Sequence, residues 1–184
     1  MKKVFVLLVF AGLSFSLSPS LPAQEQAVGA GKMFYAELGG PGVLMSINWD
    51  MRFKSNTRLG FGYRVGVGFS IGEFEEEKAT DPYGYYESRT RSYYTIPIGL
   101  NYVLGKPNSS SAFEIGAGAT FLTREKSLFT YREEKPGHFI GHLAFMYRIT
   151  PVNGGFSFRV GFTPIIGTSG DLFPMGGISF GYVF

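Results

Sequence analysis

The sequence predicts an all-β protein, an eight-stranded antiparallel transmembrane β-barrel of the outer-membrane type with a closed polar interior. Three observations lead to this prediction. Eight segments alternate large apolar residues with small or polar ones at a period of two. The connections between these segments are short and long in a regular order. The chain also begins with a segment that is typical of secretory signal peptides.

The composition fits one folded, strand-rich domain. Of the 184 residues, 45% are hydrophobic and 17% are charged, which is too apolar for a disordered chain. Aromatic residues make up 17% of the chain and there are 26 glycines, a combination that suits short strands and tight turns better than helices. The sequence has no cysteine, which excludes disulfides, thiolate metal sites, thiol nucleophiles and a lipid-modified cysteine.

The first residues predict export. Two lysines precede an apolar run from Val4 to about Leu17, and prolines and the small residue Ala23 follow it. We expect cleavage after Ala23, so that residues 1–23 are a signal peptide and residues 24–184 form the barrel domain. A retained signal anchor is the alternative, but the run is shorter than the roughly 20 residues that span a bilayer. Because cleavage lowers the net charge from +3 to +1, the basic charge gives no support for a nucleic-acid partner.

The longest alternating segment spans residues 58–72. From Leu59 to Ile71 the odd-numbered residues are all large and apolar, whereas the even-numbered residues are mostly glycine, with Arg64 and Ser70. A glycine face is a poor choice for solvent contact but fits a crowded interior, so we expect the bulky face to contact lipid. The other expected strands lie at residues 32–38, 43–53, 92–104, 112–122, 138–149, 156–163 and 176–184.

The connections predict how the barrel is oriented. If the chain starts and ends on the periplasmic side, the two long charged connections, residues 73–90 and 123–137, are both outer loops, and every even-numbered connection is a short turn. Bacterial outer-membrane barrels follow this rule and have an even number of strands. The first connection, GGPG at residues 39–42, is expected to be a short outer turn. Pro97 lacks a ladder donor within a strand, so we expect a bulge there.

Four stretches resemble a known family. They are ELGGPGVLMSINWDMRF, IPIGLNYVLGK, GGFSFRVGFTP and the terminal GISFGYVF. Together they resemble small outer-membrane β-barrel proteins of the Bacteroidetes type, whose architecture is similar to OmpX and the OmpA transmembrane domain. The resemblance implies an integral protein of a Gram-negative outer membrane and implies no particular activity. The alternating Ile178, Phe180, Tyr182 and Phe184 also resemble the C-terminal signal that the outer-membrane assembly machinery binds during biogenesis.

Eight ionisable residues lie on the strand faces that are expected to point into the barrel. They are Glu37, Asp50, Arg52, Arg64, Glu114, His142, Arg148 and Arg159. Eight strands leave only side-chain space inside the barrel, so these groups must pair with one another or with trapped water. One interpretation is a packed network of ion pairs that fills the interior. The other is a proton or ion path.

Metal and catalytic sites are not expected. His138 and His142 would lie about 13 Å apart along one strand face and could not share an ion. Glu114, His142 and Ser157 share the interior parity, but a lipid-modifying hydrolase needs its triad on the face where an acyl chain arrives. We therefore expect no enzyme activity, no cofactor and no metal, with a lipid A-modifying enzyme as the first alternative.

The two long connections carry the candidates for contacts outside the cell. Arginines there suit lipopolysaccharide phosphates, and tyrosines offer adaptable contact area for a partner. These residues are Arg89, Arg91, Arg124, Arg132, Tyr83, Tyr85 and Tyr86. A plain solvated surface is the other interpretation. The sequence thus predicts a structural or surface-interaction role, in envelope integrity, adhesion or lipopolysaccharide contact, and a narrow passive pore is the second alternative.

Overall fold

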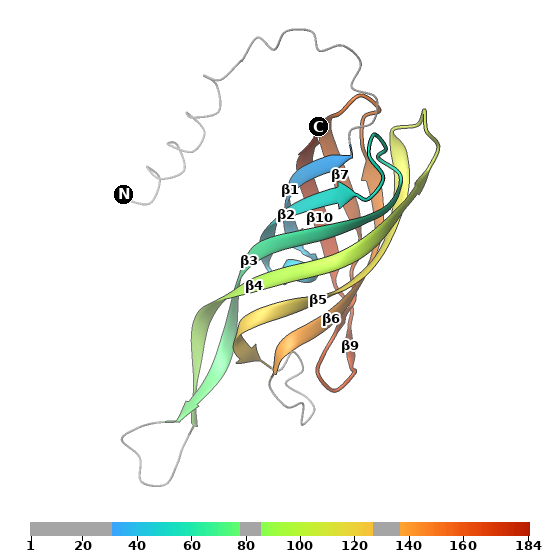
Figure 1. The fold of residues 1–184 in the computed structure, drawn as a ribbon. Helices are drawn as coiled ribbons and strands as arrows, with labels where there is room; N and C mark the ends of the chain where they lie inside the picture. The colour runs from blue at the N-terminus through green and yellow to red at the C-terminus, as the bar shows by residue number, and fades with distance from the viewer. Residues whose placement is uncertain (1–30, 78–85, 127–136) are drawn as a thin grey trace, which may run out of the picture.

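A computed structural model describes residues 31–77, 86–126 and 137–184, which form one antiparallel sheet closed into a barrel (Figure 1). The main strands are β1 (Lys32–Gly39), β2 (Met45–Arg52), β3 (Gly60–Glu77), β4 (Tyr86–Gly105), β5 (Ser111–Lys126), β6 (Gly137–Ile149), β7 (Gly155–Phe162) and β10 (Gly176–Val183). Each pairs with its neighbour in the chain, β1 pairs with β10, and no strand is left with an unpaired edge along the barrel wall. The expected signal peptide lies outside the described residues.

Two further short strands belong to this same set of eight. β8 (Ile165–Ile166) continues β7, because it pairs with β6 in the same register as β7 does. β9 (Leu172–Phe173) precedes β10 in the same way, because it pairs with β8 in the register that joins β7 to β10. Pro164 and Pro174, which have no N–H, stand where the two strands are interrupted. The barrel therefore has eight strands, and the predicted all-β, eight-stranded antiparallel fold is confirmed.

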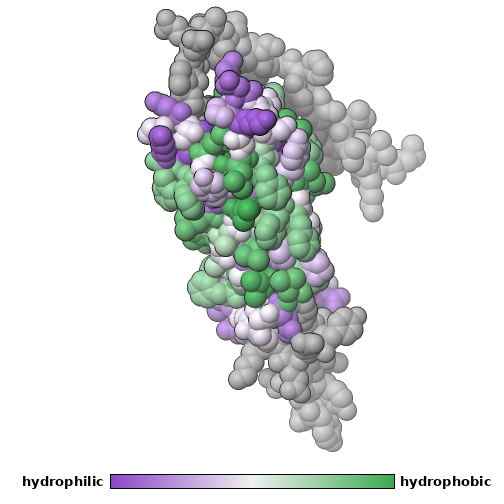
Figure 2. Space-filling view, turned by 90° about the vertical axis from the view of Figure 1, so that its right-hand side faces the viewer, coloured by the Kyte–Doolittle hydropathy of each residue, from purple (hydrophilic) through white to green (hydrophobic). Residues whose placement is uncertain are grey.

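Side chains alternate between the two faces of the wall. In β1 every second residue is buried inside the barrel, and the residues between them are exposed. The exposed residues are large and apolar, such as Val67 (62% exposed) and Phe180 (62%). On the face of the molecule drawn in Figure 2, hydrophobic residues cover the middle of the barrel and hydrophilic residues gather toward its two ends. Such a band on the outer face is what lipid contact requires. No helix among the described residues is long and apolar enough to cross a membrane.

The two ends of the barrel differ. One end carries the start of β1, the end of β10 and the short turns around residues 53–59, 106–110 and 150–154; we name it the turn end. The opposite end carries the connections after β1, β3, β5 and β7, and we name it the ribbon end. Pairs of aromatic rings flank the apolar band, with Phe156 against Tyr182 toward the turn end and Phe69 against Tyr94 toward the ribbon end.

At the ribbon end the β3–β4 hairpin extends far beyond the barrel (Figure 1). β2 pairs with β3 only as far as Phe69, and β5 pairs with β4 only from Thr95. Beyond these points β3 and β4 pair with each other out to Glu77 and Tyr86, and neither pairs with another strand of the described residues. We name this two-stranded segment, residues 70–77 and 86–94, the ribbon. The expected long connection over residues 73–90 is wrong at both of its ends, because residues 73–77 continue β3 and residues 86–90 belong to β4, while residues 78–85 lie outside the described residues.

Pro97 does not produce the expected bulge. The register between β3 and β4 is the same at Val65–Ile98 and at Gly68–Thr95, and only the pairs between these two are missing. Pro97 itself pairs with Thr120 on its other side. The proline thus removes ladder pairing toward β3 without an extra residue, because its missing N–H faces that strand. A register shift occurs instead between β5 and β6, from Phe121 to Lys126.

Candidate functional site

The structure places all eight of the ionisable candidates inside the barrel. Each is at most 5% exposed: Glu37, Asp50, Arg52, Arg64, Glu114, His142, Arg148 and Arg159. They come from six different strands, since the period of two aims every second side chain of each strand at the barrel axis. They do not all join one network, and their contacts divide them into a connected group and three separate residues.

Five of the residues form a connected ion-pair network, which we name the central network. Glu114 Oε2 accepts from Arg148 Nη1 at 2.9 Å, and Glu114 Oε1 accepts from Arg159 Nη2 at 2.8 Å. Asp50 accepts from Arg52 through Oδ1 and lies 3.7 Å from Arg148 through Oδ2. All five side chains are at most 5% exposed, so the network replaces solvent across this part of the interior.

Asn101 is the residue that links the two carboxylates of the central network. Its Nδ2 donates to Asp50 Oδ2 at 2.7 Å and to Glu114 Oε1 at 3.2 Å, while its Oδ1 accepts from Arg52 Nη2 at 2.7 Å. Asn101 was not among the residues predicted for the interior network, because its side chain carries no charge. The signal was present, since Asn101 has the interior parity of β4.

Glu37 and His142 bind polar groups outside the central network. Glu37 Oε1 accepts from the Ser179 hydroxyl at 3.0 Å. His142 Nδ1 lies 3.2 Å from Thr120 Oγ1, and that hydroxyl donates its single proton to the carbonyl of Pro41 at 2.9 Å. Nδ1 of His142 must therefore carry a proton and donate to Thr120, which leaves Nε2 as an acceptor in the neutral ring.

Arg64 has no hydrogen-bond or ion-pair partner among the described residues, although it is only 1% exposed. It lies in the register row Arg64, Gly99, Gly118 and His142 across β3 to β6. A Cβ placed on Gly99 would lie 3.2 Å from His142 Nε2 and 3.4 Å from Arg64 Nε. The two glycines thus leave the space into which the arginine and the histidine extend from opposite sides.

The ribbon end of the interior is closed by the first connection. Gly40–Gly42, a single 3₁₀ turn (η1), is buried inside the barrel, and we name it the plug. Its carbonyls accept from the wall, Pro41 from Thr120 at 2.9 Å and Gly42 from Thr95 at 3.1 Å. The GGPG segment was expected to be an ordinary outer turn. It folds inward instead, and Gly39 and Gly40 permit this with φ of 70° and 67°.

An apolar cluster lies beside the plug at the ribbon end. Tyr93, Leu122, Ile140 and Ile165 are each at most 2% exposed and pack together, and the partly buried Val43, Phe74 and Met175 pack against them. The interior is thus layered, with this apolar cluster and the plug toward the ribbon end and the central network toward the turn end. The expected closed polar interior is correct for the middle and incomplete for the ribbon end.

The residues considered for catalysis do not converge. His142 contacts Thr120, Glu114 contacts two arginines and Asn101, and the Ser157 hydroxyl contacts Thr150 Oγ1 at 2.9 Å and the Ile149 carbonyl at 3.0 Å. Within the described residues there is also no group of three or more His, Cys, Asp or Glu side chains that could hold a metal ion. His138 is separate from His142, with Nδ1 at 2.9 Å from the Leu122 carbonyl.

The candidates for outer contacts fall partly on the ribbon. Tyr83, Tyr85 and Arg132 lie outside the described residues, and Tyr86 begins β4. Arg89 and Arg91 lie on the same face of β4 as the buried Tyr93, since they are separated from it by even numbers of residues. Arg124 lies over the Phe74 ring, with 5.8 Å between its Cζ and the ring centroid. Phe74 pairs with Arg89 in the ribbon. Arg89, Arg91 and Arg124 therefore share the ribbon side that continues the barrel interior, rather than the lipid side.

The residues of the expected assembly signal line the lipid side of β10. Ile178, Phe180, Tyr182 and Phe184 are 44% to 62% exposed. The rings contact aromatic neighbours on adjacent strands: Phe180 lies 5.1 Å from Phe158, and Phe184 lies 5.5 Å from Trp49 between ring centroids. The last residue continues the β1–β10 ladder, with Phe184 N–H donating to the Lys32 carbonyl at 3.0 Å.

A closed eight-stranded barrel with an apolar outer band and a filled, ion-paired interior defines a barrel of the outer-membrane type. Comparison with solved structures supports this class. The chain is similar to the crystal structure of the N-terminal β-barrel domain of Pseudomonas aeruginosa OprF, with a TM-score of 0.50 and 10% sequence identity over 84% of this chain and 98% of that one. At this identity the likeness shows the fold alone. No protein-family model and no curated protein sequence matches the chain.

Proposed function

We propose that the protein is an integral outer-membrane barrel that displays the ribbon outside the cell as an interaction surface. The barrel wall supports the location, because its apolar outer band suits lipid and its closure leaves no backbone edge in the membrane. The turn end would face the periplasm and the ribbon end the outside, as the lengths of the connections predict. Export through the predicted signal peptide and insertion through the signal at Phe184 belong to the same proposal.

The ribbon is the observation that carries the interaction role. Beyond Phe69 and Thr95 its two strands continue as one ladder with each other, which carries the ribbon past the last strand pairs of the barrel wall. An exposed strand edge is a template on which a partner can add a strand of its own. The edge of β4 is closed at Tyr94, where the Thr123 hydroxyl accepts from Tyr94 N–H at 3.0 Å and donates to Tyr94 C=O at 3.2 Å. Strand addition would therefore begin beyond Tyr94.

The filled interior argues for an interaction role over a pore. The plug, the apolar cluster and the central network succeed one another along the barrel axis, and the side chains that form them are almost completely buried. A conducting path would require several of these contacts to break together. We therefore place the membrane anchor in the barrel and the interaction surface in the ribbon.

A ribbon truncation tests this proposal. Residues 75–88 are replaced by Asn-Gly, which joins the register partners Phe74 and Arg89 by a two-residue hairpin turn and retains the packing of Phe74 on the apolar cluster. Cells carrying the full-length or the truncated barrel are compared for adherence to protein-coated surfaces and for aggregation with one another. We expect the truncated barrel to reach the membrane at normal levels, with adherence reduced to that of cells lacking the protein.

A second variant serves as the matched control. Arg89, Arg91 and Arg124 are each replaced by glutamine, which keeps the ribbon and removes its basic face. Adherence that survives this change and is lost on truncation would indicate recognition of the strand edge, whereas loss in both variants would indicate an anionic partner. Equal adherence of the truncated and the full-length barrel would contradict the proposed role.

A further inference from the structure

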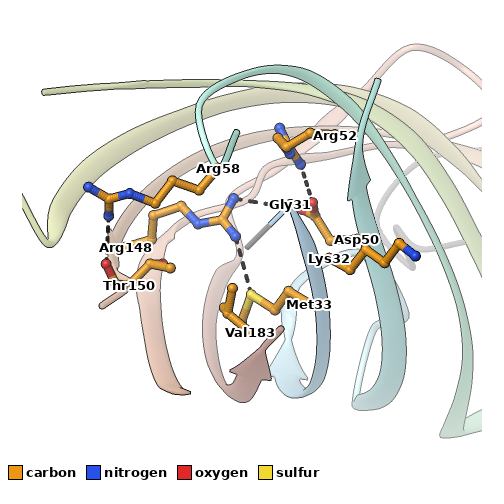
Figure 3. A pocket seen from close by; sticks show the side chains of 9 residues that line it. All are labelled: Gly31, Lys32, Met33, Asp50, Arg52, Arg58, Arg148, Thr150 and Val183. Carbon is orange, nitrogen blue, oxygen red and sulfur yellow. Dashed lines mark hydrogen bonds and ion pairs between the residues drawn. The ribbon is translucent and has the colours of Figure 1, made fainter. Parts of the chain in front are cut away.

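A small pocket lies at the turn end of the barrel, between the start of β1 and the end of β6 (Figure 3). Its volume is ≈ 10 Å³, on the scale that holds one water molecule or one ion of similar size. Four cationic side chains, Lys32, Arg52, Arg58 and Arg148, line it together with a single carboxylate, Asp50. The lining is therefore strongly positive for a site this small.

The one carboxylate is already occupied. Asp50 Oδ1 accepts from Arg52, and Oδ2 accepts from Asn101 at 2.7 Å. Neither Lys32 nor Arg58 forms an ion pair with any described residue. Arg58 Nη1 instead donates to the Thr150 carbonyl at 2.7 Å, and its Nη2 lies within hydrogen-bond distance of the Lys106, Pro107 and Ser109 carbonyls. The four cationic side chains that line the pocket therefore outnumber its one carboxylate among the described residues.

Arg148 is almost completely buried, at 4% exposed, yet part of its guanidinium lacks a good acceptor. Its Nη1 binds Glu114, but its Nη2 has only the Met33 sulfur as a partner, at 3.2 Å, and its Nε has none among the described residues. A thioether is a weak acceptor for a guanidinium. In Figure 3 this guanidinium lies between Arg58 on one side and Asp50 and Met33 on the other.

Arg58 and Arg148 also repel each other. Burial lowers the pKa of Arg58, and the positive charge of Arg148 lowers it further. Two arginines that line one small space are stabilised when an anion lies near both, because it accepts the N–H groups that remain available and compensates their charge.

We propose that this pocket binds one small monovalent anion of chloride size, held by Arg148 and Arg58 with Lys32 at its entrance. The volume selects the size of the ligand, since a phosphate or a carboxylate-bearing molecule is larger than the single water-sized space. Excess guanidinium and ammonium donors select its sign. The ion would fix the end of β6 and the turn at Arg58 against the start of β1, and its binding is independent of the ribbon and of its role.

The test uses the full barrel and bromide as the probe. Bromide replaces chloride in crystals of the refolded protein, and anomalous scattering locates the ion. We expect one peak in the pocket within contact of the Arg148 and Arg58 guanidinium groups. A well-ordered pocket without an anomalous peak at a bromide concentration that labels other surface sites would overturn the proposal.

A second measurement connects the ion to stability. The temperature at which the folded gel band converts to the unfolded band is compared in chloride and in gluconate at equal ionic strength. We expect a higher midpoint in chloride for the wild-type protein and for Lys54→Gln, which removes one exposed charge from the same end without lining the pocket.

The variant Val183→Ile adds one methyl group at the pocket wall while every charge is kept. We expect it to abolish both the bromide peak and the chloride shift. A chloride shift that persists in Val183→Ile would place the halide elsewhere and overturn the proposal, as would a midpoint that responds to phosphate and not to halide. The bromide map of the wild-type protein needs no variant and decides the question if Val183→Ile does not fold.

Discussion

Small residues determine which charges the barrel can hold. Gly99 and Gly118 stand between Arg64 and His142 in one register row, and a Cβ at Gly118 would lie 2.6 Å from His142 Nε2. A Cβ at Gly116 would lie 3.0 Å from the Leu100 carbonyl, so the same crowding continues along β5. In this row, the large side chains of Arg64 and His142 fit because the two strands between them contribute glycine. The glycine face of the sequence is therefore the counterpart of the interior arginines.

Two of those arginines should respond in opposite ways to replacement by methionine. Arg159→Met removes a buried partner of Glu114, and we expect a loss of about 3–5 kcal/mol in the free energy of unfolding. Arg64→Met removes a buried charge that has no hydrogen-bond or ion-pair partner among the described residues, and we expect no loss or a gain of about 1–4 kcal/mol. Urea unfolding in lipid vesicles measures both. A comparable loss in the two variants would show that Arg64 is held by interactions as strong as those of Arg159.

The plug is an element whose position depends on two wall hydroxyls. Thr120→Val keeps the shape of the side chain but leaves the Pro41 carbonyl and His142 Nδ1 without their partner in a closed interior. We expect a loss of about 1–3 kcal/mol in the free energy of unfolding, and faster hydrogen exchange at the amides of Gly40 and Gly42. Thr90→Val, an exposed position on the ribbon, is the matched control. Unchanged exchange in Thr120→Val would mean that packing alone holds the plug.

The strands could be predicted from the sequence more closely than the connections. A period of two fixes which side of a strand faces lipid, and so the placement of Arg64 and Glu114 inside the barrel follows from their neighbours. The alternation along a strand does not show which charged side chains form ion pairs. The pairing of Glu114 with Arg148, for example, depends on the register between strands that are far apart in the chain. Nor does local pattern show that GGPG folds inward, since its partners Thr95 and Thr120 lie on distant strands. The segment from Glu73 to Glu77 was expected to form a loop because its run of acidic residues lacks the alternation of large apolar and small residues that marks the strands of the barrel wall.

At the scale of the whole molecule, the barrel combines an apolar exterior with a polar interior, the reverse of a water-soluble protein. Outward residues such as Phe61 (63% exposed) and Ile98 (56%) would be costly in water and are favourable against lipid chains. Among the described residues, the plug, the apolar cluster and the central network fill the interior with buried side chains, and the ribbon extends beyond the apolar band. The boundary between membrane and ribbon should therefore fall between the last strand pairs of the barrel wall and the first residues of the ribbon.

Two outward positions on β3 test where this boundary lies. Val65 is in the barrel wall, paired with strands on both sides, and Ile71 is in the ribbon, paired with β4 alone. We expect Val65→Arg to lower the free energy of unfolding in lipid vesicles by about 2–4 kcal/mol, because a guanidinium near the bilayer centre loses its hydration. Ile71→Arg should cost about 0–1 kcal/mol, because its side chain reaches the interface or water. Both side chains are exposed in the absence of lipid, 39% for Val65 and 52% for Ile71, so a water-soluble barrel would tolerate the two substitutions equally. Equal costs in vesicles would therefore contradict insertion at this depth, and a large cost at Ile71 alone would move the apolar layer toward the ribbon.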